Sequence, residues 1–310
     1  MAGKNLEVLT VGHILYDVRC YVDKFPQPDK SAVIDGGIHA SGGGSAANVA
    51  ISLSMLGRKC GIACNIGTDR HGAFLHADLK KAGIDLNGVQ VCRGKSGMSI
   101  ILVDKHAEVE VIESLGVSDN YAKIAKGYAS QFRHLHVTGM NFRTTREAIS
   151  RAYSSGLSIS YDSGRFMSGG GEKAIGGVLS KIDQLIINRK ELAALTGKKA
   201  YKNEKDALAD ARRIAKKYSL DFCVKGGKEK TIVARADGSH FAVTPYKVKV
   251  VDTIGAGDAF AAGFIDAFLD GRKLEECVRF ASGCSAEEIM RPGAHSGLDK
   301  KYILKRFKPY

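Results

Sequence analysis

Short apolar runs that resemble β-strands alternate with helical stretches along most of the 310-residue sequence. Strands separated by helices pair in parallel, and both faces of their sheet are covered. The sequence therefore predicts an α/β fold with a doubly wound, mostly parallel sheet and helices on both faces. The predicted strands are residues 7–11, 61–66, 134–138, 157–161, 184–187 and 222–224, and the predicted helices include residues 44–57, 72–82 and 204–217.

Two segments, residues 20–39 and 96–112, interrupt this alternation with strand patterning and no helix between the strands. The second contains a hairpin-like pair of runs at residues 100–103 and 109–112. The segments form either a small separate β-sheet or an antiparallel extension of the main sheet. Because no repeat or low-complexity linker divides the chain, we expect one domain over residues 1–310 with both segments inserted in it.

A glycine-rich junction, Gly255-Ala256-Gly257, lies between a strand-like alternation at residues 246–251 and an apolar helical run at residues 259–269. Glycines at such a junction let consecutive backbone N–H groups converge in front of a helix N-terminus. That arrangement binds an anion through peptide dipoles. The junction therefore predicts an anion hole.

Asp258 follows directly, in the first turn of the predicted helix. A carboxylate there would repel a bound phosphate, so its position needs a chemical reason. We interpret Asp258 as a general base that removes the proton from a hydroxyl attacking phosphorus. The alternative is that Asp258 only complements the helix dipole while the glycines form a tight turn.

A second glycine cluster, residues 42–50 (GGGSAANVA), runs directly into another helical stretch. Its glycines, Gly43 among them, let the backbone approach a ligand closely. Asn48 lies near the first turn of that helix, where its amide can both donate to and accept from a polyol.

Several motifs occur together in one order along the chain. The motifs are residues 11–17 (VGHILYD), 42–48 (GGGSAAN), 65–72 (NIGTDRHG), 188–191 (NRKE), 252–258 (DTIGAGD) and 291–294 (RPGA). With these motifs in this order, the sequence resembles the ribokinase, or PfkB, family of carbohydrate and nucleoside kinases over nearly its whole length, and it is most similar in appearance to archaeal members.

The resemblance implies a ribokinase-like fold and a kinase that transfers the terminal phosphoryl group of a nucleotide, ATP or ADP, to a hydroxyl of a small sugar or nucleoside. Asp17, at the end of the family's first strand, would hold adjacent hydroxyls of this acceptor, and Gly43 and Asn48 would complete the polyol pocket. Ligands of parallel sheets gather at the carboxyl ends of the strands, where Asp17, Asn188 and Asp258 are all expected. For Asp17 the alternative is a capping role. In the family, segments such as 20–39 and 96–112 form a small β-sheet lid over the sugar.

The resemblance also places nucleotide and metal near four residues. Asn188 and Glu191 would hold Mg²⁺, mostly through water. These two residues also have the pattern of a capping box, and the two roles are compatible. Lys225 and Gly227 would lie beside the nucleotide phosphates, together with Gly257.

The nature of the acceptor depends on two arginines, Arg143 and Arg165, which follow predicted strand ends. An arginine fork suits a phosphate far better than a neutral sugar. The alternative function is therefore a sugar-phosphate kinase, for example one acting on ribose 1-phosphate, with these arginines on the substrate phosphate. Both could equally be surface residues. A catalytically silent nucleotide- or sugar-binding regulator is a further alternative, disfavoured by the intact Asp258.

The net charge of +13 is compatible with polyanionic ligands. Its lysines and arginines are dispersed without a helix-turn-helix pattern or an aromatic-interleaved basic stripe, so we expect no nucleic-acid partner. The N-terminus lacks an apolar signal core and no long apolar segment occurs, so we expect a cytoplasmic protein without membrane contact. The family resemblance also allows a potassium site near Asp252 and Gly293, and a homodimer formed through the lid.

Overall fold

The protein is represented by a computed structural model that describes residues 6–125, 127–164, 171–295 and 297–309. Within these residues a nine-stranded sheet has the order β13-β12-β11-β10-β9-β8-β1-β4-β5. All neighbours from β11 to β5 are parallel, and only β12 and β13 are antiparallel. The strands are β1 (Val8–Val11), β4 (Cys60–Gly67), β5 (Asp85–Cys92), β8 (His134–Val137), β9 (Ser158–Tyr161), β10 (Gln184–Asn188), β11 (Asp221–Lys225), β12 (Thr231–Ala234) and β13 (His240–Val243).

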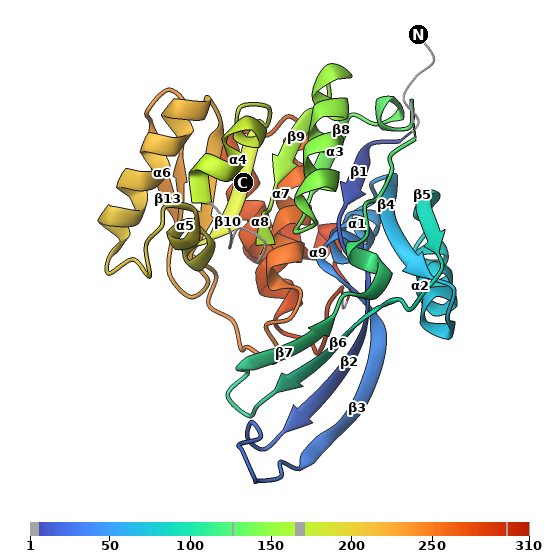
Figure 1. The fold of residues 1–310 in the computed structure, drawn as a ribbon. Helices are drawn as coiled ribbons and strands as arrows, with labels where there is room; N and C mark the ends of the chain where they lie inside the picture. The colour runs from blue at the N-terminus through green and yellow to red at the C-terminus, as the bar shows by residue number, and fades with distance from the viewer. Residues whose placement is uncertain (1–5, 126, 165–170, 296, 310) are drawn as a thin grey trace.

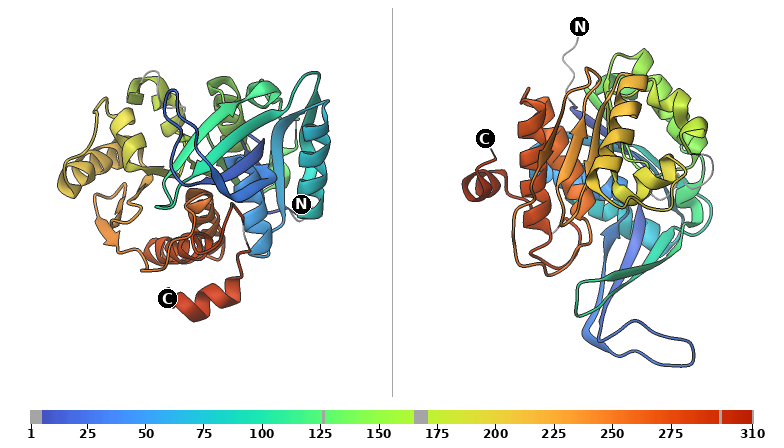
Figure 2. Two further views of the ribbon diagram at one scale, coloured as in Figure 1. Left: turned by 90° about the horizontal axis from the view of Figure 1, so that it is seen from below. Right: turned by 90° about the vertical axis from the view of Figure 1, so that its left-hand side faces the viewer.

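Helices cover both faces of this sheet (Figure 2). Residues of α1, α2, α7 and α8 belong to one buried cluster, and residues of α3, α4, α5 and α6 belong to the other. The doubly wound, mostly parallel α/β fold expected from the sequence is confirmed. The helices are α1 (Ser45–Met55), α2 (Arg70–Lys81), α3 (Phe142–Ser154), α4 (Gly171–Leu179), α5 (Arg189–Leu195), α6 (Glu204–Tyr218), α7 (Ala256–Leu269), α8 (Leu274–Glu288) and α9 (Lys300–Phe307).

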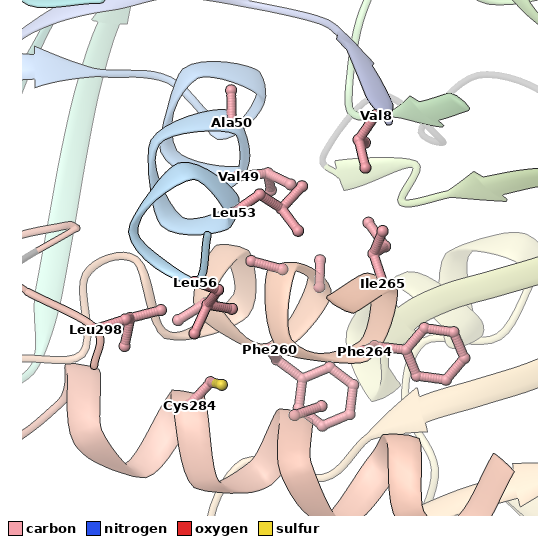
Figure 3. Close-up of a cluster of buried hydrophobic side chains, with 14 of the residues drawn as sticks. Val8, Val49, Ala50, Leu53, Leu56, Phe260, Phe264, Ile265, Cys284 and Leu298 are labelled. Atoms are coloured by element: carbon pink, nitrogen blue, oxygen red, sulfur yellow. The ribbon is translucent and has the colours of Figure 1, made fainter. Parts of the chain in front are cut away.

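One of these two buried clusters joins α1, α7 and α8 (Figure 3). Leu53 of α1, Phe260 and Phe264 of α7 and Cys284 of α8 meet there, each at most 4% exposed. Fully burying one large apolar side chain stabilises a fold by about 1.5–3 kcal/mol. This packing fixes α1 and α7 relative to each other, and hence the positions of their N-termini.

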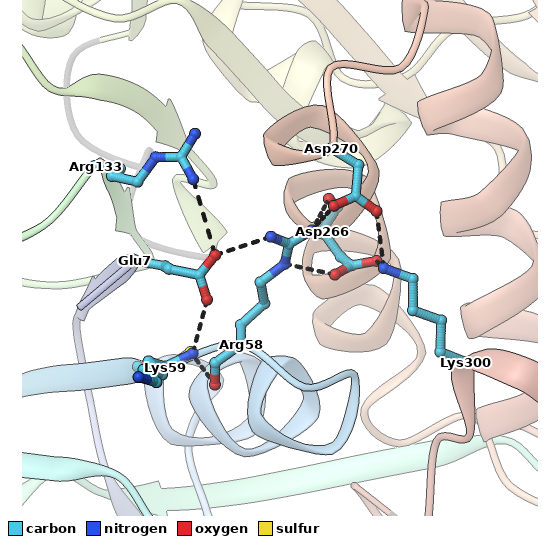
Figure 4. A network of polar contacts seen from close by, with 8 residues as sticks. Glu7, Arg58, Lys59, Arg133, Asp266, Asp270 and Lys300 are labelled. Carbon is cyan, nitrogen blue, oxygen red and sulfur yellow. Dashed lines mark hydrogen bonds and ion pairs between the residues drawn. The ribbon is translucent and has the colours of Figure 1, made fainter. Parts of the chain in front are cut away.

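A charged network ties the opposite ends of the same two helices together (Figure 4). Arg58, just after α1, donates to Oδ1 of Asp266 in α7 at 2.6 Å and to Oε1 of Glu7 at 2.9 Å. Lys300 pairs with the other oxygen of Asp266 at 2.7 Å. Because Asp266 is fully buried, its charge depends on these cations for compensation.

A second sheet of four strands, ordered β3-β2-β6-β7, projects from one end of the large sheet (Figure 1). β2 is parallel to β6, and the other neighbours are antiparallel. We call this sheet the lid sheet, after the role that the family resemblance led us to expect for its strands. Its strands are β2 (Leu15–Val22), β3 (Ile34–Gly43), β6 (Gly97–Val103) and β7 (Val109–Ser114).

Two local expectations were wrong. Asp17 does not end the first strand of the large sheet; β1 stops at Val11, and Asp17 lies within β2 of the lid sheet. Residues 246–251 are not a strand, and in the described part of the chain they pair with none. Their alternation arises because Tyr246 and Val248 pack against the core while Lys247 and Lys249 are exposed.

The helix starts explain which N–H groups are available to a ligand. Among the described helices, five begin at an Asn or Asp whose side chain accepts from a backbone N–H of the first turn, namely α2, α3, α5, α6 and α9. Among the described side chains none caps α1 or α7, which begin at Gly44 (φ 88°) and Gly255 (φ 74°). The Ala256 N–H of α7 donates to the Thr253 carbonyl at 3.3 Å. In the described part of the chain, no side chain accepts from the first-turn N–H groups of either helix, which leaves the others available to a ligand. In the described ranges, no helix has the length and apolar character needed to cross a membrane.

Candidate active site

A cavity of about 370 Å³ lies where the lid sheet meets the N-termini of α1 and α7 and the strand ends of the large sheet. It brings together most of the residues selected from the sequence. Those lining it are Asp17, Asn48, Asn188, Glu191, Lys225, Gly255, Gly257 and Asp258. A neighbouring cavity of about 740 Å³ shares Asn188, Lys225, Thr253 and Gly257 with it.

Asp258 lies in the first turn of α7, as expected, and this helix begins at Ala256. Residues 246–251, which the sequence suggested as a strand leading into this helix, are not a strand in the described structure, so Asp258 does not lie at a strand end. Burial raises the pKa of Asp258 to about 6, while a hydrogen bond from Asn48 and the charge of Lys225 act against this rise. The carboxylate is therefore ionised at neutral pH, with a basicity suited to accepting a proton.

The Gly255–Gly257 turn at the start of α7 is packed closely against neighbouring groups. A Cβ built on Gly255 would lie 2.9 Å from Cα of Ala294, and the residue has a positive φ of 74°. Both conditions require glycine. A Cβ on Gly257 would lie 3.4 Å from Nζ of Lys225, so this lysine reaches the same small space as the helix N–H groups.

Asp17 occupies the lid side of the cavity. Burial raises its pKa to about 6, whereas a hydrogen bond from Ser99 and the nearby Arg19 lower it. Gly43 packs directly against this carboxylate, because a Cβ at residue 43 would lie only 1.8 Å from Oδ2 of Asp17. Gly43 thus makes room for Asp17, and its neighbour Gly44 lines the cavity.

Asn188 ends β10, at the carboxyl edge of the sheet as expected. Its side chain accepts from the Glu191 N–H at 2.9 Å, and Glu191 accepts from the Asn188 N–H at 2.7 Å, which completes a capping box. Burial, and then the charge of Asp162, raise the pKa of Glu191 to about 7. Among the described residues, no group of three or more His, Cys, Asp or Glu side chains is arranged to hold a metal.

Lys225 forms an ion pair with Asp162, with 2.6 Å between Nζ and Oδ2. Burial alone lowers the pKa of Lys225, but Asp162, Glu191 and Asp258 together raise it above its usual value. Lys225 therefore remains a cation between three carboxylates.

The sequence interpretation missed Asp162 as a site residue, although it directly follows β9 and the strand-end rule could have found it. It also missed Ser99 and Glu113. Ser99 and Ile101 of β6, and Val111 and Glu113 of β7, all line the cavity from one face of the lid sheet. No signal in the sequence identified that face before the strand pairing was known.

The two arginines proposed for a substrate phosphate behave differently. Arg143 is exposed in α3, and its guanidinium carbon lies 4.3 Å from the ring centroid of Tyr121. It is not among the residues that line either cavity, so the structure does not bring it to Asp17. Arg165 lies outside the described residues.

The larger cavity has an apolar wall and a basic rim. Val248, Phe260 and Ile289 supply apolar surface, and Gly227 and Lys228 line it next to Lys225. Such a slot suits a planar base, with the phosphates directed along the shared residues toward the smaller cavity.

Comparisons with known proteins agree with this geometry. The family model described as pfkB family carbohydrate kinase matches residues 5–301. An ATP-dependent ribose-1-phosphate kinase from Halopiger xanaduensis is 35% identical over 94% of this chain and 94% of its own. A nucleoside kinase from Methanothermobacter thermautotrophicus is 26% identical over 98% of this chain and 96% of its own.

Solved structures share the fold. Arabidopsis thaliana ribokinase complexed with ribose and ATP has a TM-score of 0.84 at 20% identity, covering 98% of this chain and 99% of that one. The nucleoside kinase from Methanocaldococcus jannaschii has a TM-score of 0.82 at 20% identity and covers 100% of both chains. From the family match and the 35% identical relative, the chain belongs to the pfkB family of carbohydrate kinases.

Proposed function

We propose that this kinase transfers the terminal phosphoryl group of ATP to a hydroxyl of a small sugar or nucleoside, with Asp258 as the general base. The single observation that supports this best is the position of the Asp258 carboxylate, which lines the acceptor cavity beside the uncapped N-terminus of α7. A base there reaches the attacking hydroxyl while the helix N–H groups face the transferred oxygens.

In this proposal the other residues bind and orient. Asp17 accepts from two neighbouring hydroxyls of the acceptor, and Asn48 holds Asp258 in place. The N–H groups of Gly255, Ala256 and Gly257 and the Lys225 ammonium stabilise the charge that develops on the phosphoryl oxygens. Asp162 orients Lys225 through their 2.6 Å ion pair.

We place Mg²⁺ near Asn188 and Glu191. The donor set suits this cation, because a hard ion takes oxygen ligands and keeps much of its water. When bound, Mg²⁺ would neutralise charge on the nucleotide phosphates. The ionised form of Glu191, whose pKa is raised to about 7 by burial, would be favoured by the cation.

A potassium ion near Asp252 and Gly293 fits poorly. Oδ1 of Asp252 accepts from the Ile254 N–H and Oδ2 from the Gly293 N–H, each at 2.9 Å. The guanidinium of Arg19 lies against Gly293, with Nη1 2.6 Å from where a Cβ on that glycine would be. The positive charge of the Arg19 guanidinium would repel a potassium ion bound beside it. We therefore assign no step to potassium and expect equal activity in sodium and potassium salts.

The lid sheet would close over the acceptor and exclude water. Its outer face exposes apolar side chains, including Ile38 (65%), Ile100 (36%) and Ile112 (65%). We propose that a second copy of the chain covers this face in a homodimer, because such a patch of isoleucines is unusual on an unpartnered surface. Sedimentation of the wild-type chain and of Ile38→Glu tests this, and a monomeric wild type would reject it.

The acceptor class is tested by nucleotide consumption with D-ribose, cytidine and ribose 1-phosphate. Asp17 and Glu113 on the acceptor side favour a neutral polyol. Ribose 1-phosphate is the second candidate, because the 35% identical relative is named a ribose-1-phosphate kinase. If the free sugar and cytidine react and ribose 1-phosphate does not, the second candidate fails. Absence of turnover with every acceptor would favour a silent binding protein.

Arg143→Ala separates the two candidates further. A phosphate contact through this arginine would make the acceptor KM rise about tenfold or more on its removal. Because Arg143 stacks on Tyr121 outside the cavity, we expect the KM to remain within about twofold of wild type.

A further inference from the structure

Tyr21 links the lid sheet to the loop that precedes the anion hole. It lies on β2, the strand that carries Asp17, and the alternation of side chains puts Asp17, Arg19 and Tyr21 on one face. The Tyr21 hydroxyl donates to Oδ2 of Asp252 at 3.0 Å, across a sequence separation of 231 residues. The acceptor-binding strand and the phosphoryl-binding loop thus share a direct contact.

Asp252 organises two loops at once. Its side chain is fully buried, and its oxygens accept from the N–H groups of Ile254 and Gly293. Gly255 packs against Ala294, with 2.9 Å between its would-be Cβ and Cα of Ala294. The start of the anion hole is therefore formed by two loops that the Asp252 carboxylate holds together.

Arg19 completes the link from the lid side. It is 8% exposed, its charge lowers the pKa of Tyr21, which burial and then the charge of Asp252 raise, and its guanidinium lies against Gly293. Its Nε has no hydrogen-bond partner, and within the described residues no carboxylate lies within ion-pair distance of it. A buried carboxylate and a buried guanidinium each need nearby countercharge, and Tyr21 lies between these two.

We infer that Tyr21, supported by Arg19, is a positioning residue through which lid closure assembles the anion hole. When the acceptor binds Asp17, β2 moves toward the core and brings the Tyr21 hydroxyl and the Arg19 guanidinium to Asp252. Asp252 then holds the loop that contains Ile254 and Gly255 in the conformation of the anion hole. When the lid opens, Asp252 no longer contacts Tyr21 or Arg19, and the loops around Ile254 and Gly293 become less ordered. This inference rests on the proposed position of the acceptor at Asp17.

Tyr21→Phe removes the hydroxyl and keeps the ring. We expect kcat to fall about tenfold while the KM for the acceptor changes by less than about twofold, since the lost hydrogen bond to a charged group acts on the hole and not on Asp17. The matched control is Tyr201→Phe, which removes a 2.7 Å hydrogen bond to Asp210 far from the site and should change neither parameter. A raised acceptor KM with unchanged kcat, or no change at all, would overturn the inference.

A second measurement does not depend on knowing the acceptor. In hydrogen exchange with the non-hydrolysable analogue AMP-PNP, Tyr21→Phe should speed exchange of the amides in residues 252–257 about tenfold, with the large sheet unaffected. If no tested acceptor is phosphorylated by the wild type, the proposed substrate class fails, but this measurement still decides the inference. Unchanged exchange in residues 252–257 would reject it.

The route through Asp252 is tested by a double-mutant cycle. If Tyr21 acts through Asp252, then Tyr21→Phe in an Asp252→Asn background should lower kcat by less than about twofold more. Should Asp252→Asn fail to fold, Arg19→Gln serves in its place, because it removes the charge that supports the same hydroxyl. Fully multiplicative effects in the cycle would place Tyr21 and Asp252 in separate roles and contradict the inference.

Discussion

The side-chain amide of Asn48 donates a 2.8 Å hydrogen bond to Oδ2 of Asp258, joining the first turns of α1 and α7 across 210 residues of sequence. Both helices begin at glycines, and their apolar faces pack on each other in the core beneath. The contact orients the proposed base with a donor from the helix expected to bind the acceptor. Asn48 therefore bears on the basicity of Asp258, beyond the polyol contact expected from the sequence.

Asp258→Asn should lower kcat by about 10²–10⁴-fold, the usual range for loss of a general base, with little change in ligand affinity. The pKa of Asp258 in the folded protein, about 6, lies above the value of 3.8 for an unperturbed Asp. Folding stability therefore falls as the pH rises from about 4 to 6, and the ionised carboxylate destabilises the fold at every higher pH. The variant should therefore be no less stable than wild type at pH 7. Steady-state kinetics and thermal unfolding measure both effects. Retention of more than half of the wild-type kcat would exclude Asp258 as the base.

Asn48→Ala should move the acidic limb of the pH profile. The hydrogen bond from Asn48 lowers the pKa of Asp258, which burial has raised to about 6, so its removal raises that pKa further. A base with a higher pKa is protonated over a wider range, and the acidic limb of kcat/KM shifts to higher pH. A pH–rate profile from about pH 5 to 9 tests this.

The control for that shift is Ser99→Ala. Ser99 donates to Asp17 and not to Asp258, so we expect its removal to affect the acceptor KM more than the acidic limb of the Asp258 base. An acidic limb that stays in place in Asn48→Ala, while kcat falls, would mean that Asn48 acts only on the substrate.

Arg58→Ala should destabilise the fold by about 3–5 kcal/mol, because it leaves the buried Asp266 charge with Lys300 as its remaining cation. Activity at low temperature should remain close to wild type, since the network lies at the far ends of α1 and α7. Arg279→Ala is the matched control: it breaks an exposed pair with Glu275 and should cost about 0.3–0.5 kcal/mol. Urea unfolding of the two variants decides. Equal losses would show that the Arg58 network is no stronger than a surface pair.

The parts of the site that follow from local pattern could be predicted from the sequence. Strand-helix alternation locates Asn188 at a strand end, and the glycine junction locates Asp258 in a first helical turn. Local pattern does not show which sheet a strand joins. Asp17 follows the first strand closely in sequence, yet it belongs to the lid sheet, because the chain leaves the large sheet after Val11.

Contacts between distant segments were beyond prediction for a different reason. The Asp162–Lys225 pair and the Tyr21–Asp252 bond depend on strand order and on how the lid meets the core, and neither leaves a periodic signal in the sequence. Alternation alone also led to the wrong prediction of a strand at residues 246–251. In the described structure this segment pairs with no strand, and the alternation arises because one side of it packs on the core. For Arg143, position after a strand left open whether the side chain faces the acceptor or lies on the surface, and in the structure it stacks on Tyr121 outside the cavity.

Gly43→Ala should act on the acceptor alone. The added methyl would lie 1.8 Å from Oδ2 of Asp17, closer than any two unbonded atoms can approach, so the carboxylate must move. Because Asp17 is the proposed holder of the acceptor hydroxyls, its displacement should raise the acceptor KM about tenfold or more, while the nucleotide KM stays within about twofold. Gly177→Ala is the control, since a Cβ there meets nothing within 4 Å. If Gly43→Ala raised the nucleotide KM as much as the acceptor KM, Asp17 would not be specific to the acceptor.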